Sequence, residues 1–198
     1  MLKGVSMHIK GGENVGIVGK TGSGKSSIFA VLTRMIDFLH LGDGIIEIDG
    51  INIEDMSLKD LRTRIVTISQ DPIVLNGSLQ YNVDPLGLHT TQEVIEALQK
   101  VEIFQTIRFP PKAGHSSPEK GKEMHLLTAH AKEEHSVEEY LKFVVEPNGD
   151  NLSVGQKQLI CIARALLKKA KILLLDEATA NIDIRMDHLL QRLIKQEL

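Results

Sequence analysis

The chain has 198 residues, which suits one domain that can bury its own hydrophobic core. Charged residues make up 25% and the formal net charge is −3, so no general basic field attracts nucleic acid. The single cysteine, Cys161, excludes an internal disulfide framework, and no apolar run approaches the roughly 18 residues of a membrane span. We therefore expect a soluble domain with no nucleic-acid partner and no direct membrane insertion.

The first motif is a glycine-rich loop at residues 19–26 that reads Gly-Lys-Thr-Gly-Ser-Gly-Lys-Ser. Its glycines let backbone N–H groups close around phosphate oxygens without obstruction by side chains. The apolar residues 15–18 before it predict a buried strand, and residues 27–32 after it have a helical apolar pattern. A nucleotide's phosphates would then lie at a helix N-terminus. We predict binding by Gly19, Lys20, Thr21, Gly22, Ser23, Gly24, Lys25, Ser26 and Ser27; the alternative is a glycine-rich structural turn.

Several short elements follow the loop. Alternating isoleucines around Asp49-Gly50 predict an antiparallel hairpin over residues 44–53. Residues 57–64 predict a short helix, and residues 65–68 a strand that leads directly to Gln70 before Pro72 stops regular structure. Residues 91–101 carry a helical apolar stripe that begins a helical subdomain.

The amino-acid composition changes at residues 110–146, which are rich in lysine, glutamate and histidine. This composition predicts a solvated insertion. His125, His130 and His135 recur every fifth residue, a spacing that does not bring them together on a helix, so no metal site is expected there. Apolar residues at helical spacing over residues 137–144 indicate that the end of the insertion docks on the domain.

Sequence patterns typical of regular secondary structure resume after Asp150. Ser153 stands three residues before Gln156, as in a capping box, so a helix is expected to start at Ser153 and to end near residues 168–169. The apolar residues 171–175 then predict a central parallel strand. Asp176 and Glu177 follow directly after that strand.

These residues suit phosphoryl chemistry. Magnesium takes hard oxygen ligands, which the loop hydroxyl of Ser26 and the strand-end carboxylate of Asp176 would supply. The ammonium of Lys25 would stabilise charge on the β and γ phosphates, and Glu177 is placed to polarise an attacking water. The plainer interpretation of Asp176-Glu177 is ordinary acidity at a helix start.

Five motifs stand in the order found in the nucleotide-binding domains of ABC transporters. They are the phosphate loop, Gln70 within Ser-Gln-Asp-Pro, Asn-Leu-Ser-Val-Gly-Gln at residues 151–156, Leu-Leu-Leu-Asp-Glu-Ala-Thr at residues 173–179, and Asn-Ile-Asp at residues 181–183. Residues 2–6, residues 81–85 and the valine-containing signature resemble the second such domain of the C, or multidrug-resistance-associated, subfamily. The resemblance covers nearly the whole chain except the insertion.

The resemblance implies an α/β fold: a P-loop NTPase core of the ABC ATPase type, with a small antiparallel β subdomain and an α-helical subdomain over residues 81–167. Residues 1–198 would be one ABC-type domain, incomplete at both termini. It also implies ATP and Mg²⁺ as ligands, a second nucleotide-binding domain in a head-to-tail dimer, and transmembrane domains of the same transporter at a membrane's cytoplasmic face. Ser153, Gly155 and Gln156 would then contact the partner's nucleotide, while Gln70 would contact magnesium and water.

Departures from the family pattern matter too. Val154 stands where the family commonly has glycine, so the site completed by this signature is expected to be the weaker one. The family's adenine-stacking aromatic and switch histidine are expected outside residues 1–198, which makes hydrolysis by this chain alone weak. We expect an ATPase that powers export. The alternatives are a degenerate or regulatory module that binds ATP without efficient turnover, and a soluble ABC ATPase of DNA repair or translation.

Overall fold

The centre of the fold is a pair of parallel strands, β3 (Ile65–Ile68) and β6 (Ile172–Leu175). The computed structural model describes residues 4–36, 44–109, 135–177, 182 and 184–197. Ile65 lies opposite Ile172 and Ile68 opposite Leu175, so the two strands end at the same level. Both strands were predicted from their apolar residues, and both predictions are confirmed.

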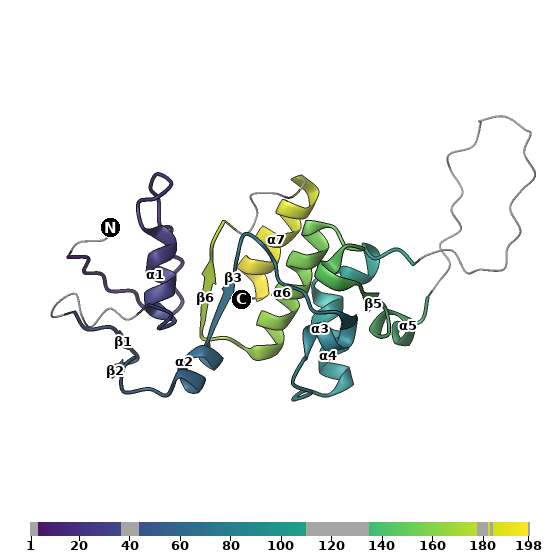
Figure 1. The fold of residues 1–198 in the computed structure, drawn as a ribbon, viewed down its shortest axis with the longest axis horizontal. Helices are drawn as coiled ribbons and strands as arrows, with labels where there is room; N and C mark the ends of the chain where they lie inside the picture. Colours follow the sequence, from purple (N-terminus) through teal and green to yellow (C-terminus); the bar gives the residue numbers. More distant parts are fainter. Residues whose placement is uncertain (1–3, 37–43, 110–134, 178–181, 183, 198) are drawn as a thin grey trace, which may run out of the picture.

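Each face of this strand pair packs against a different set of helices, because side chains alternate along a strand. Val66 and Ile68 join the main core with α6 (Val154–Lys168). Ile65 lies on the other face, in a smaller core that Phe29 and Leu32 of α1 cover. Helix α1 spans Lys25–Leu32. Figure 1 shows α1 on one side of the strands and α6 on the other.

The predicted hairpin is confirmed as β1 (Glu47–Ile48) paired with β2 (Ile51–Asn52). Asp49 and Gly50 connect the strands with φ of 51° and 76°, a left-handed pair that an Asp-Gly turn tolerates. Helix α2 (Leu58–Arg64) follows, as predicted, with its N-terminus capped by the hydroxyl of Ser57.

A helical layer packs against α6 on the side away from α1. The predicted α4 (Thr91–Lys100) buries Val94, Ala97 and Leu98. Helix α3 (Leu79–Val83) was not predicted, since five residues carry too little periodicity. The short 3₁₀ turns η2 (Ile103–Gln105) and η3 (Pro147–Gly149) complete this layer.

Residues 135–145 dock on this helical layer, which agrees with the expected docking of the insertion's end. Helix α5 (Val137–Leu141) is followed by β5 (Val144–Val145), which pairs with β4 (Gly77–Ser78). Of the predicted apolar face, Leu141 is buried and Tyr140 packs on the core, whereas Val137 and Val144 stay exposed. The histidines at positions 125 and 130 lie outside the described residues.

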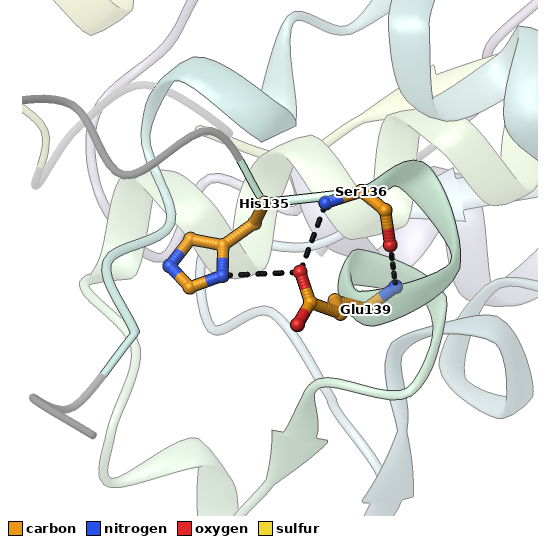
Figure 2. A network of polar contacts seen from close by, with 3 residues as sticks. All are labelled: His135, Ser136 and Glu139. Carbon is orange, nitrogen blue, oxygen red and sulfur yellow. Dashed lines mark hydrogen bonds and ion pairs between the residues drawn. The ribbon is translucent and has the colours of Figure 1, made fainter. Parts of the chain in front are cut away.

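Polar contacts fix the start of α5 (Figure 2). The hydroxyl of Ser136 accepts the Glu139 N–H, and the Glu139 carboxylate accepts the Ser136 N–H at 2.9 Å and faces His135 Nδ1 at 3.3 Å. The His135 ring also stacks on Phe109, with 4.0 Å between ring centroids. Two residues that are 26 positions apart in the sequence are thereby held together.

Helix α7 (Ile184–Glu197) closes the main core from the C-terminal side. Leu190 and Leu193 are buried there, although the sequence analysis made no prediction for this helix. In the part of the chain that the structure describes, no helix combines the length and apolarity needed to cross a membrane.

The prediction of a buried strand at residues 15–18 is wrong. These residues belong to no strand, and the side chains of Val15, Ile17 and Val18 are 51%, 36% and 97% exposed. A strand needs a neighbour for its backbone N–H and C=O groups, and β3 and β6 pair only with each other among the described strands. A short apolar run shows hydrophobicity but not whether a partner strand is present.

Candidate nucleotide site

The glycine-rich loop and the two strand ends line one open cleft of about 520 Å³. Its walls carry nine of the predicted site residues: Thr21, Gly22, Gly24, Lys25, Ser26, Ser27, Gln70, Asp176 and Glu177. Three segments that are distant in the sequence thus meet where a triphosphate would have to bind.

The loop itself has the backbone that its glycines permit. Gly22 and Gly24 have φ of 81° and 98°, in the left-handed region that side chains other than glycine rarely adopt. A Cβ on Gly19 would lie 2.6 Å from Ser23 Oγ, so a side chain at this position would require the Ser23 hydroxyl to move. Glycine at positions 22 and 24 therefore follows from the shape of the loop's backbone.

Lys25 stands at the first position of α1 and closes the loop. Its Nζ donates to the carbonyl oxygens of Gly19 at 2.9 Å and Lys20 at 3.4 Å, which holds the ammonium over the loop. The N-cap residue, Gly24, offers no side chain to the first N–H groups of α1. An ammonium and uncapped N–H groups at one place have the chemistry that favours an anion.

Gln70 and Asp176 enter the cleft because they follow parallel strands that end together. The Asp176 N–H donates to the Ile68 carbonyl at 2.9 Å, which extends the β3–β6 pairing by one residue. Gln70 lies two residues beyond Ile68 at the same edge. Ligands of parallel α/β sheets bind outside this carboxyl edge.

The donor set of the cleft fits magnesium. Ser26, Gln70 and Asp176 offer a hydroxyl, an amide carbonyl and a carboxylate, all hard oxygen donors. Within the described ranges no group of three or more His, Cys, Asp or Glu residues is arranged for a metal. One carboxylate with neutral oxygens is the mixed set that Mg²⁺ uses when phosphate oxygens complete its shell.

Glu177 has an unusual backbone. It is exposed, borders the cleft and has φ of 49°, a left-handed conformation that is uncommon for a glutamate. The chain therefore turns sharply directly after Asp176. Strained backbone of this kind concentrates at functional sites, which makes Glu177 a candidate for the reaction itself.

The predicted signature residues lie elsewhere, at the start of α6, and none of them lines this cleft. The predicted capping box is present: Ser153 Oγ accepts the Gln156 N–H, and Gln156 Oε1 accepts the Ser153 N–H at 2.7 Å. Gln156 Nε2 also donates to the Thr106 carbonyl at 2.6 Å. Ser153 is exposed, whereas Gly155 is buried and a Cβ there would lie 2.7 Å from Met186 Cγ.

The sequence analysis missed Gln158, which contacts the segment that carries Gln70. Its side chain is 1% exposed, and its Nε2 donates to the Ser69 and Gln70 carbonyls at 3.3 and 3.4 Å. One sequence signal could have identified it. Gln158 is a polar residue next to Leu159 and Ile160, on a helix whose inner face is otherwise apolar, and a buried amide needs hydrogen-bond partners.

Comparison with known proteins gives a consistent assignment. The family model described as "ABC transporter" matches residues 2–180. The whole chain is 40% identical to human ATP-binding cassette sub-family C member 3 and 43% identical to the maize ABC transporter C family MRP4. It is also 40% identical to rat ATP-binding cassette sub-family C member 2. In each case the match covers 100% of this chain and 11% of the relative's length.

The chain belongs to the ABC transporter family, and its relatives are members of sub-family C. The predicted fold class is thereby confirmed: the family's nucleotide-binding domain is a P-loop NTPase, here with a small antiparallel sheet and a helical layer. The chain spans about a tenth of the length of these relatives, 11% in each case.

Proposed function

We propose that this chain is a domain that binds and hydrolyses ATP and that powers export by a sub-family C transporter. One observation carries the proposal: the glycine-rich loop, Gln70 and the Asp176-Glu177 pair line a single cleft. Family membership supports it, since the relatives are named as ATP-binding cassette proteins. We propose further that the chain is one domain, interrupted by the insertion at residues 110–146, and that it corresponds to the second nucleotide-binding domain.

The residues of the cleft have three separate roles in the proposed reaction. Loop N–H groups and the Lys25 ammonium bind and orient the phosphates, and they stabilise the negative charge that moves as the terminal phosphoryl leaves. Ser26, Gln70 and Asp176 would hold Mg²⁺, which neutralises phosphate charge when it is bound. Glu177 orients a water and accepts its proton, so that hydroxide character develops next to the γ-phosphate.

The partners that we propose are a second nucleotide-binding domain and the transmembrane domains of the same transporter, at the cytoplasmic face of its membrane. The exposed Ser153 hydroxyl at the N-terminus of α6 is available to the partner's nucleotide. Gly155 and the Gln156 side chain are held within the chain, which favours a supporting role for both in shaping that helix end.

A second candidate function is ATP binding without efficient turnover. The observation in its favour is Val154, whose side chain is 39% exposed at the N-terminus of α6. A branched side chain there crowds the surface that would face the partner's phosphates. The intact Glu177 opposes this alternative, because the carboxylate that turnover needs is present.

ATP with Mg²⁺ is expected to stabilise the purified chain against thermal unfolding. A ligand at a hundred times its dissociation constant adds about 2.7 kcal/mol to the free energy of unfolding. Differential scanning fluorimetry with ATP, with ATP plus EDTA and with adenosine measures the effect. We expect the largest rise in Tm with ATP and Mg²⁺ and none with adenosine, which lacks phosphates. Equal curves for adenosine and ATP contradict phosphate recognition by the loop.

A further inference from the structure

Side chains of α6 reach the segment that connects β3 to α3. Gln158, Cys161 and Arg164 recur every third residue, so they share one face of the helix. Besides the two Gln158 bonds, Arg164 Nη1 donates to the Ile73 carbonyl at 2.6 Å, and Cys161 Sγ lies 3.9 Å from that oxygen. Gln70 is therefore part of a segment that α6 holds at both ends.

The outer end of this segment is anchored independently of Gln158. Arg164 donates through Nε to the Asn82 carbonyl at 2.5 Å and through Nη2 to Asn82 Oδ1 at 3.3 Å. Asn82 is fully buried and exchanges two hydrogen bonds with the backbone of Leu75. This anchor fixes residues 73–82 and does not reach Gln70. Among the described side chains, Gln158 bonds the carbonyl of Gln70 itself.

The orientation of the Gln158 amide follows from its partners. Both contacts are backbone carbonyls, which only accept hydrogen bonds, so the nitrogen must face them. Its Oε1 is buried and has no hydrogen-bond partner among the described residues. Buried polar atoms are normally paired, so an amide with one unpaired end indicates a purpose other than packing.

We infer that Gln158 is a positioning residue: its amide holds the backbone of Gln70 so that the Gln70 side chain stays on the wall of the nucleotide cleft. Gln70 is exposed, and the Ser69–Gln70 carbonyls are the points at which Gln158 holds it. The inference rests on the proposed function, because a fixed Gln70 matters when its amide carbonyl serves Mg²⁺ beside Ser26 and Asp176.

The test compares Gln158→Met with wild type in the 198-residue chain. Methionine keeps the length and apolar stem but loses the donor. Without nucleotide or metal, we expect faster amide hydrogen exchange in residues 69–71, the part of the segment that Gln158 holds and the Arg164–Asn82 anchor does not. With ATP, we expect the Mg²⁺ concentration that gives half of the metal-dependent gain in affinity to rise about tenfold, the usual order for loss of a ligand's supporting contact. ATP affinity in EDTA is expected to stay unchanged.

Three further variants make the result specific. Gln70→Ala is expected to raise the Mg²⁺ requirement in the same way, and Gln70→Ala/Gln158→Met no further, since both act through one interaction. Gln99→Leu, on the exposed face of α4, is the control and is expected to change neither readout. Gln158→Asn, which keeps a neutral amide but shortens the side chain by one methylene and so withdraws the donor from the two carbonyls, serves if Gln158→Met does not fold.

Different outcomes separate the two proposals. A wild type whose ATP affinity depends on Mg²⁺, beside a Gln158→Met variant with the same Mg²⁺ requirement and the same exchange, overturns only the role of Gln158. Additive losses in the double variant overturn it as well, because they assign Gln158 an effect that does not pass through Gln70. A wild type that binds no ATP overturns the proposed function and, with it, this role.

Discussion

Replacement of Lys25 by alanine is expected to weaken ATP binding by about a hundredfold, or about 2.7 kcal/mol. The ammonium is held over the loop by the Gly19 and Lys20 carbonyls, and Lys25 is the one cationic residue among the described residues that line the cleft. Charge-assisted hydrogen bonds to phosphate are about twice as strong as neutral ones, so alanine removes the strongest single contact. Isothermal titration calorimetry with ATP and Mg²⁺ measures the loss.

Lys59→Ala is the matched control for Lys25→Ala. Lys59 lies exposed on α2, and it does not line the cleft. We expect its ATP affinity to equal that of wild type, with both variants folded by circular dichroism. A folded Lys25→Ala variant that binds ATP with wild-type affinity would show that the loop does not hold the phosphates.

Glu177→Gln is expected to reduce ATP turnover by a factor on the order of a hundred or more while leaving ATP affinity within about twofold. Glutamine keeps the shape of the side chain but cannot accept a proton from water. General-base catalysis contributes roughly a hundred- to ten-thousandfold, which sets the expected loss. The rate of phosphate release is to be measured in the longer transporter that we propose, because the second nucleotide-binding domain completes the site.

The control for Glu177→Gln is Glu138→Gln, an exposed position on α5 that does not line the cleft. Its turnover is expected to match wild type. Equal turnover in wild type and Glu177→Gln would falsify the assignment of Glu177 as the base. If both proteins bound ATP and neither released phosphate, the second candidate function would be favoured.

Local sequence signals predicted the elements whose chemistry is local. The Asp49-Gly50 turn forced the hairpin, and Ser153 with Gln156 marked the start of α6. The strand of residues 65–68 was predicted with its exact bounds because apolar β-branched residues end at polar ones. The magnesium contact of Gln70 was predicted from the family resemblance and that of Asp176 from its place at a strand end, and both residues line the cleft. The structure supplies the reason, since parallel strands share their carboxyl edge.

Features that depend on distant partners were missed or mispredicted. The β4–β5 pair joins residues 77–78 to residues 144–145, and two-residue strands carry no periodicity. Burial of Asn82 and Gln158 depends on carbonyl groups that the fold brings to them, which composition does not reveal. Residues 15–18 have the composition of a buried strand but lack a paired neighbour in the structure.

An experimental structure of the chain with Mg²⁺ and a non-hydrolysable ATP analogue would show where the phosphates and the metal bind. We expect the β and γ phosphates to accept hydrogen bonds from the loop N–H groups and from Lys25 Nζ. We expect one Mg²⁺ to be bound by Ser26 Oγ and to lie beside the Asp176 carboxylate, with metal–oxygen distances of about 2.1 Å. A triphosphate bound away from the loop, or a metal ion that neither Ser26 nor Asp176 approaches, would contradict the proposed nucleotide site.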